Sequence, residues 1–389
     1  MLFLSRKNQR FAKEKAPYKS TSLTAMTLRR FRKDTMAMIS VGIILLFSLI
    51  AILGYLITPD HTPYCNQQYL ELATMKPFSK ATFLCVEPSA MGNEDVERQS
   101  VGHSEERVGW FRKMIHGEPL PYTAIPIYSH KDMGDYIEIE TYTGSTPNDG
   151  EIQRFRKSDV VKIQTRTFLF GTDGYGRDVL SQIMIGSRVS LSVGFIAIII
   201  ALVIGITLGA LAAYYGGWVD NLIMWLINVV WSIPTVLLVI AITFALGKGF
   251  WQVFVAVGLT MWVDIARVVR GQVFSIKEKE YVEAARALGY STFRIVFRHI
   301  LPNIMGAVIV VTASNFASAI LLEAGLSFLG IGVQPPMPSW GSMVKENYGY
   351  ILLDSAYLAL LPGLAIMVIV LAFMMLGNGV RNALDIKNQ

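Results

Sequence analysis

Six long apolar stretches run along this chain of 389 residues, and each is long enough to cross a lipid bilayer as a helix. Such a helix needs about 20 predominantly apolar residues. The predicted spans cover residues 36–57, 189–213, 222–246, 250–269, 303–322 and 355–377. Charged side chains make up 16% of the chain, against about 25% in a soluble domain. We therefore predict an all-α integral membrane protein with six transmembrane helices.

Lysine and arginine are distributed unevenly among the segments that join these spans. The tail of residues 1–35 has ten of them, and the link between the fourth and fifth spans has seven, from Arg267 to Arg298. With six spans, both segments fall on one side, and cytoplasmic loops carry the excess of positive charge. The N- and C-termini are therefore predicted to be cytoplasmic. The net charge of +6 then reflects membrane topology, and no nucleic acid is expected as a partner.

The segment 58–168 separates the first two spans and lies outside the membrane under this topology. Residues 136–143 alternate between apolar and polar with period two, residues 144–150 are rich in turn formers, and residues 159–165 read as a second strand. We predict a small β-containing extracytoplasmic insertion. Both cysteines of the chain, Cys65 and Cys85, lie in it. Because disulfides persist in oxidising compartments, a Cys65–Cys85 disulfide is predicted, with two free thiols as the alternative.

A short helix is predicted at residues 278–289, in the basic link between the fourth and fifth spans. Its apolar side chains recur at i, i+3, i+4 and i+7 and form one narrow face: Tyr281, Ala284, Ala285 and Leu288. Gly289 follows, where a left-handed residue would end the helix. The helix is too short and too charged to cross the bilayer, so its apolar face needs another protein or the membrane surface.

This segment, EAARALG followed by LP, resembles the EAA signature of ABC-importer permeases, which forms the helix that docks into the ATPase subunit. The residues that match the signature are Glu283, Ala284, Ala285, Gly289, Leu301 and Pro302. Four further stretches resemble the dipeptide/oligopeptide/nickel permeases: LRRFRKDTMAMISVGII at 28–44, GTDGYGRD at 171–178, GSRVSL at 186–191 and LSFLGIGVQPPMPSWG at 326–341. The tail at 376–387 departs from the family pattern.

The resemblance implies the type I ABC-importer permease fold in a bacterial inner membrane. The expected domains are a basic tail at 1–35, a first helix at 36–57, the insertion at 58–168 and the transmembrane domain at 169–386. The implied partners are a homologous second permease subunit, two cytoplasmic ABC ATPase subunits or domains, and an extracytoplasmic substrate-binding protein. Di- or oligopeptides are the expected substrate, and nickel or another small solute is the alternative.

The chain has no nucleotide-binding motif such as G-x-x-x-x-G-K-[ST]. A transport subunit that is not an enzyme and holds no cofactor is therefore expected, with ATP hydrolysis on partner subunits. No metal site is expected either, because the histidines of the insertion lack metal-ligand spacing: His61, His103, His116 and His130. A stand-alone secondary transporter is the rival class. It should show inverted repeats and broken charged helices near the midplane, and neither pattern is found in the sequence.

Several residues inside the spans have expected roles. Thr312, Asn315 and Glu323 share one face of the fifth span and are predicted to face the translocation pathway or the second permease, with interhelical hydrogen bonding as the alternative. Asp264 stands one turn before Arg267, so a local ion pair is predicted. Proline lacks an N–H group, so Pro234 should kink the third span. Small residues of the second span should allow close helix contact: Gly194, Gly205 and Gly209.

Overall fold

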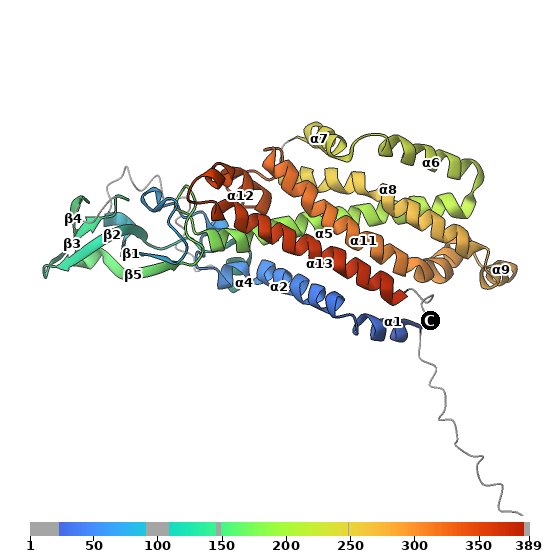
Figure 1. The fold of residues 1–389 in the computed structure, drawn as a ribbon, viewed down its shortest axis with the longest axis horizontal. Helices are drawn as coiled ribbons and strands as arrows, with labels where there is room; N and C mark the ends of the chain where they lie inside the picture. The colour runs from blue at the N-terminus through green and yellow to red at the C-terminus, as the bar shows by residue number, and fades with distance from the viewer. Residues whose placement is uncertain (1–22, 91–108, 145–148, 248, 385–389) are drawn as a thin grey trace, which may run out of the picture.

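The computed structural model describes residues 23–90, 109–144, 149–247 and 249–384. The described residues form a helical bundle with a small antiparallel sheet at one end (Figure 1). Short helices lie at both ends of the bundle, outside the membrane-spanning ones: α1 (Leu23–Phe31), α4 (Trp110–His116), α9 (Glu280–Ala287), α10 (Thr292–Ile295) and α12 (Trp340–Asn347). The sheet and α9 therefore occupy opposite ends of the molecule.

Five helices within the described residues are long and apolar enough to cross a membrane. They are α2 (Thr35–Ile57), α5 (Val179–Tyr215), α8 (Phe250–Lys277), α11 (Leu301–Phe328) and α13 (Tyr357–Leu384). They confirm five predicted spans, but several helices extend well beyond the apolar stretch. Helix α5 begins ten residues before residue 189, because the Asp178 carboxylate accepts a hydrogen bond from the Ser181 N–H and caps the helix there.

The third predicted span is not one continuous helix. It consists of α6 (Gly217–Trp231) and α7 (Thr235–Leu246), which meet at an angle of 93°. Pro234 precedes the first residue of α7 and cannot donate the hydrogen bond that would continue α6. The predicted kink at Pro234 is confirmed, and it is sharp enough to break the helix in two. The described chain thus has five spans, or six if the bent pair counts as one.

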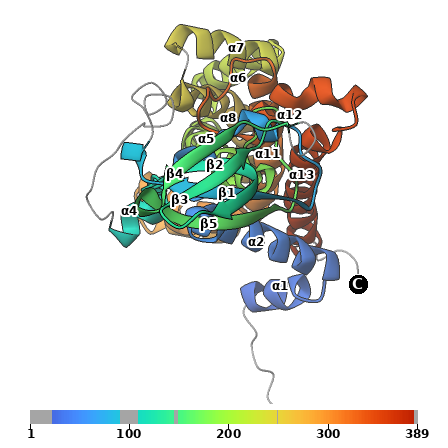
Figure 2. The ribbon, with the colours of Figure 1, turned by 90° about the vertical axis from the view of Figure 1, so that its left-hand side faces the viewer.

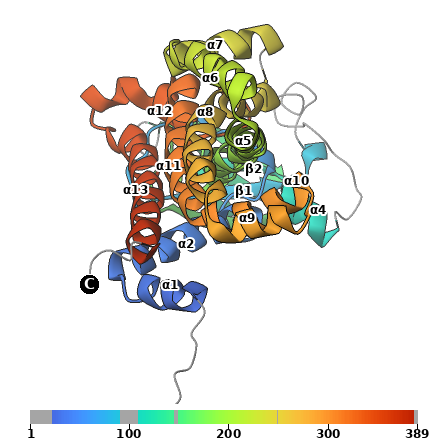
Figure 3. The ribbon, with the colours of Figure 1, turned by 90° about the vertical axis from the view of Figure 1, so that its right-hand side faces the viewer.

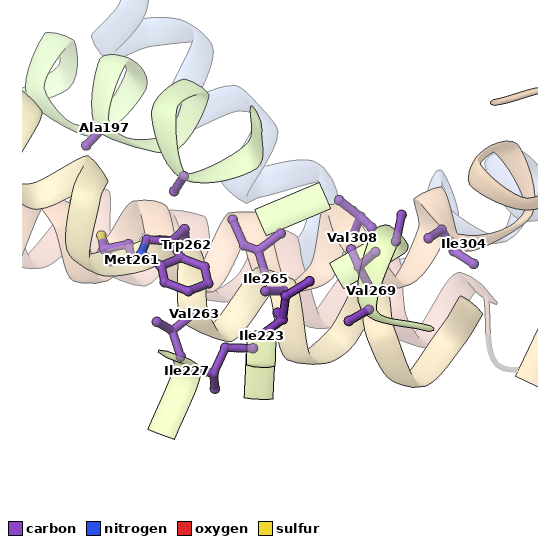
Figure 4. Close-up of a cluster of buried hydrophobic side chains, with 14 of the residues drawn as sticks. Ala197, Ile223, Ile227, Met261, Trp262, Val263, Ile265, Val269, Ile304 and Val308 are labelled. Carbon is purple, nitrogen blue, oxygen red and sulfur yellow. The ribbon is translucent and has the colours of Figure 1, made fainter. Parts of the chain in front are cut away.

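The core of the bundle forms where α5 packs along α8. A Cβ atom on Gly205 would lie 2.7 Å from Ile265 Cβ, and one on Gly209 would lie 2.5 Å from the Ala266 carbonyl oxygen. The two backbones approach so closely that only glycine fits, as the sequence predicted for these two residues. Side chains from α5, α6, α8 and α11 fill the surrounding core (Figure 4), among them Ala197, Ile227, Trp262, Ile265, Val269, Ile304 and Val308.

The sheet within the described residues has five antiparallel strands in the order β4-β3-β2-β1-β5 (Figure 2). The strands are β1 (Ser79–Val86), β2 (Thr123–Asp132), β3 (Tyr136–Thr141), β4 (Ile152–Arg156) and β5 (Val160–Phe168). Strands β3 and β5 confirm the two strands predicted from the sequence. Most of the predicted turn at 144–150 lies outside the described residues. In the interior strand β1, Leu84 pairs with Ile125 of β2 on one side and with Ile163 of β5 on the other.

The two cysteines are free thiols, so the predicted disulfide is wrong. Each is buried in a different apolar cluster. Cys65 packs with Tyr55 and Ile185 where α2 and α5 meet the sheet domain, and its thiol contacts the Asp60 carbonyl oxygen at 3.1 Å. Cys85 lies in β1 inside the sheet core, beside Phe83. A disulfide requires a short Cβ–Cβ distance, and the structure instead packs the two thiols separately.

The histidines show no metal-site geometry in the part of the chain that is described. There, no group of three or more His, Cys, Asp and Glu side chains could hold a metal ion. His61 contacts the Tyr55 carbonyl oxygen through Nδ1 at 2.8 Å, and His130 lies exposed on β2. His103 lies outside the described residues. The expectation that the chain binds no metal stays a prediction.

Candidate functional site

Helix α9 projects from the end of the bundle opposite the sheet (Figure 3). Helix α8 ends at Lys277, and Lys279 then takes an extended conformation that turns the chain into α9. The Lys279 carbonyl oxygen accepts the N–H of Val282 at 2.9 Å, which starts the new helix. The predicted bounds of 278–289 therefore enclose the observed helix together with two residues at each of its ends.

The apolar side chains of α9 divide between two faces. Val282 and Ala285 are buried in the core of the bundle. Tyr281 is 45% exposed and Leu288 is 73% exposed, and Ala284 between them is also exposed. Ala285 was predicted to belong to the exposed face, and that prediction is wrong. The i, i+3 spacing of Val282 and Ala285 could have identified this buried face. The prediction instead assigned Ala285 to the same face as its neighbour Ala284.

Gly289 ends α9 in the left-handed conformation, with φ of +74°. The Gly289 N–H binds the Arg286 carbonyl oxygen at 3.0 Å, and the Tyr290 N–H binds the Ala285 carbonyl oxygen at 3.2 Å. This pair of hydrogen bonds is the Schellman motif, which satisfies carbonyl groups at the end of a helix. The predicted glycine cap is confirmed. A side chain here would strain the backbone, since non-glycine residues rarely adopt this conformation.

A short, continuous connection joins α9 to the span α11. After the Gly289 cap, Ser291 caps α10, and a π-helical turn over Val296–Ile300 leads directly into α11. Leu301 and Pro302, the LP of the signature, form the first turn of α11, where the missing N–H of proline costs nothing. Leu301 packs against the core of the bundle.

Side-chain contacts tighten this connection. The rings of Tyr290 and His299 are stacked with their centroids 6.0 Å apart, and the Asn303 amide donates to the Tyr281 hydroxyl at 3.4 Å. Together with the buried Val282 and Ala285, these contacts hold α9 on the base of α11. Helix α9 is therefore attached to the start of a membrane-spanning helix.

The polar residues predicted to line a pathway instead bind neighbouring groups inside the chain. Glu323 is fully buried and accepts hydrogen bonds from Ser190 of α5 at 3.1 Å and Ser327 at 2.7 Å. The Asn315 amide is buried and donates to the Met261 carbonyl oxygen of α8 at 3.3 Å. The Thr312 hydroxyl donates within its own helix. The pathway prediction is wrong for Asn315 and Glu323, and the interhelical hydrogen-bond alternative describes them.

The predicted ion pair between Asp264 and Arg267 is also wrong. The Arg267 guanidinium turns towards α6, where it lies 3.4 Å from the centroid of the Trp231 ring and donates to Asn228 at 3.4 Å. Stacking on tryptophan is a favoured arrangement for a guanidinium group. Asp264 is exposed on α8.

The GTDGYGRD stretch forms a buried polar cluster between the bundle and the sheet. Arg177 is 8% exposed at its side chain and forms ion pairs with Asp173 at 2.6 Å and with Glu346 of α12 at 2.5 Å. Asp178 caps α5, as described above. The motif therefore fixes the start of α5 against α12 and makes no exposed site.

Two family models match this chain. Residues 205–387 match the binding-protein-dependent transport system inner membrane component, and residues 22–77 match the N-terminal TM domain of oligopeptide transport permease C. The dipeptide transport system permease protein DppC of Alkalihalophilus pseudofirmus is 43% identical over 218 residues, which are 56% of this chain and 71% of that protein. The chain belongs to this family of inner membrane transport permeases.

A second named relative and a solved structure are also similar to this permease. The glutathione transport system permease protein GsiD of Pectobacterium atrosepticum is 42% identical over 56% of the permease and 72% of its own length. Among solved structures, the inward-facing MetNI methionine ABC transporter is 19% identical, with a TM-score of 0.44 over 52% of the permease and 97% of that chain.

The two family models match two separate segments of the permease and leave the residues between them unmatched. The family models cover α2 on one side and most of the helical bundle, with α9, on the other. The sheet domain lies between the two matched segments. The resemblance noted in the sequence is therefore confirmed, and the two family models leave residues 78–204 unmatched, which contain the sheet strands and the first part of α5.

Proposed function

We propose that this permease is the membrane-spanning subunit of an ATP-driven importer of short peptides. The proposal takes its substrate class from the relatives, which are named as dipeptide and glutathione permeases. Nickel or another small solute is the alternative cargo. The full assembly would contain a homologous second permease, two ABC ATPase subunits or domains, and a substrate-binding protein.

The observation that carries the mechanism is the uncovered face of α9. Tyr281, Ala284 and Leu288 are exposed, while the neighbouring Val282 and Ala285 are buried in the core. An apolar face of this size on an otherwise charged helix requires a partner. Ala284 lets a partner's backbone come close, and Leu288 offers an apolar side chain that can enter its surface.

An ATPase subunit that grips this face can move the permease through α9. Closure of the ATPase pair on ATP would carry α9 with it, and the connection through α10 would tilt α11 relative to α8. The coupling free energy must come from contacts that differ between the two states of the ATPase. Glu283 and Gly289 belong to the same unit, since Glu283 is an exposed residue of α9 and Gly289 fixes the end of the helix.

This mechanism requires α9 to be cytoplasmic. The basic residues at the end of α1 support this orientation, because Arg29, Arg30 and nearby cations lie toward the same end of the bundle as α9 (Figure 1). The end of α13 lies at that end too, so both termini would be cytoplasmic. The sheet domain would then face the substrate-binding protein's side of the membrane.

Substitution of Ala284 tests the coupling role. In reconstituted vesicles, Ala284→Arg should abolish ATP-driven uptake, because a long cation fills the surface that the ATPase must approach. Ala284→Ser is the matched control and should keep uptake, since serine is nearly as small. Position 284 is exposed in the permease, so both variants should fold. Normal uptake by Ala284→Arg would refute the coupling role.

The substrate class needs a separate measurement. Uptake of labelled di- and tripeptides by cells that carry the permease and its partners should exceed uptake in a strain that lacks the permease. Nickel accumulation should be equal in the two strains. The opposite pattern would assign the permease to metal import and leave the role of α9 unchanged.

A further inference from the structure

Helix α4 is a short amphipathic helix between the sheet and the bundle (Figure 1). At 3.6 residues per turn, its apolar side chains fall within an arc of about 140°. This arc contains Trp110, Phe111, Met114 and Ile115. The rest of the helix circumference carries the cationic or titratable side chains, which are Arg112, Lys113 and His116. The polar and apolar arcs do not overlap.

Contacts to α2 and α5 fix the height of α4 along the bundle. The Arg188 guanidinium of α5 donates to the carbonyl oxygens of Ile115 and Met114 in α4, at 2.9 and 2.6 Å. The same guanidinium donates to the carbonyl oxygen of Ile52 in α2 at 2.7 Å. Because Ile52 lies five residues before the end of α2 at Ile57, the end of α4 is level with the last turns of this membrane span.

The residue after α4 strengthens this attachment. Gly117 lies so close to α2 and the segment after it that a Cβ atom on it would be 3.1 Å from the Tyr55 ring and 2.6 Å from the His61 carbonyl oxygen. Lys113 also forms an ion pair with Glu118 at 2.5 Å. Helix α4 is thus held against the sheet-side end of α2.

The apolar arc of α4 is nevertheless exposed. Trp110 is 67% exposed and Phe111 is 64% exposed, and Ile115 is exposed as well. Helix α2 beside it is also largely exposed. Only 11% of the most apolar 18-residue stretch of α2 is buried inside the protein. Leu49 and Ile52 are among its exposed side chains. The exposed arc of α4 continues this lipid-facing surface at the level where the span leaves the bilayer.

We propose that α4 lies in the lipid interface of the leaflet on the sheet side, with Trp110, Phe111 and Ile115 inserted between the lipids. Tryptophan and other aromatic side chains are enriched at this depth, and a helix with one apolar and one cationic face lies parallel to the membrane plane. Arg112 and His116 then face the lipid phosphates and water. The partner is the bilayer itself, and α4 fixes the height of the sheet domain above it.

Spin-label accessibility in the complete transporter tests this placement. Trp110→Cys and Phe111→Cys are labelled after reconstitution into phosphatidylcholine/phosphatidylglycerol vesicles, and collisions with oxygen and with a water-soluble nickel chelate are compared. Leu49→Cys on α2 is the lipid reference, and Ile152→Cys on the exposed strand β4 is the water reference. The wild type gives the background, since its two cysteines are buried. The ratio of oxygen to nickel accessibility at 110 and 111 should be several times that at 152 and approach that at 49.

Two results of the spin-label experiment would overturn the proposal. A ratio at 110 and 111 equal to that at 152 would place α4 in water. Labels shielded from both reagents in the complex, but accessible in the isolated permease, would show that a protein subunit covers the arc. A second measurement needs no added cysteine: brominated lipids should quench less of the total tryptophan fluorescence in Trp110→Phe than in the wild type. Equal quenching of the two proteins would also contradict insertion.

Discussion

Arg177 is the residue whose loss should most weaken the junction between the bundle and the sheet. Its guanidinium is buried between the carboxylates of Asp173 and Glu346. Arg177→Ala leaves both carboxylates without their cation, which costs about 3–5 kcal/mol for a buried pair. We expect a clear drop in the thermal unfolding midpoint of the purified permease.

Arg154 provides the control for this substitution. It pairs with Glu138 on the sheet surface, where its side chain is 65% exposed. Exposed pairs contribute less than about 1 kcal/mol, so Arg154→Ala should leave the midpoint nearly unchanged. Equal midpoints for the two variants would contradict the structural role of the buried pair.

The two cysteines should be unreactive in the folded permease. Burial raises the pKa of the Cys65 thiol well above its usual value, and the nearby carboxylates of Asp60 and Asp178 raise it further. Burial also raises the pKa of Cys85. A thiol with a raised pKa stays protonated as the pH rises, so the reactive thiolate is scarce near neutral pH.

Maleimide labelling without a reductant measures this directly. The native permease should take up no label near pH 7, and the denatured permease should take up two. A disulfide would give no labelling in either state, and labelling of the native protein would show that the thiols are accessible.

At the scale of elements, the contact between α5 and α8 sets the shape of the bundle. Gly209 approaches the Ala266 carbonyl oxygen and the Val269 side chain too closely for any added Cβ atom. Gly209→Val should separate the helices, at a cost of about 1–3 kcal/mol or more for an overpacked core. We expect a lower thermal midpoint.

Gly42 of α2 is the matched control for this change. It is exposed, and apart from the nearby backbone of α2 itself, no heavy atom of the described residues lies within 4 Å of the position of its missing Cβ atom. Gly42→Val should therefore be tolerated. If Gly42→Val and Gly209→Val had the same midpoint, close packing of α5 on α8 would not be what stabilises the bundle.

Hydropathy and helix signals in the sequence were sufficient to predict most elements. The five long spans, the break at Pro234, strands β3 and β5 and the Gly289 cap are all local features, and the structure contains each of them. The early start of α5 was missed because its first turns contain polar residues that are buried against other elements.

What the sequence could not supply is which side chains meet across elements. Asn315 and Glu323 look like a polar stripe on one helix, but their roles depend on Met261 and Ser190, which lie far away in the chain. The same holds for Ala285, whose burial depends on how α9 packs against α8 and α10. The separation of Cys65 and Cys85 is likewise set by the tertiary fold.

At the scale of the whole molecule, the sheet and α1 should lie on opposite sides of the membrane. A membrane-impermeant maleimide should therefore label Ile152→Cys on β4 in intact spheroplasts. Arg29→Cys at the end of α1 should react only after lysis. Both positions are exposed in the structure, so only the membrane distinguishes them. The reverse pattern would invert the proposed orientation.

The central claim is that an ATPase subunit grips the exposed face of α9, and site-specific photo-crosslinking tests it most directly. A benzophenone amino acid replaces Leu288 in the complete transporter, with the same replacement at Ile152 as the control. The account predicts a covalent adduct between position 288 and the ATPase subunit, and none from position 152. Adducts from position 288 to lipid alone, in a transporter that still hydrolyses ATP, would contradict it.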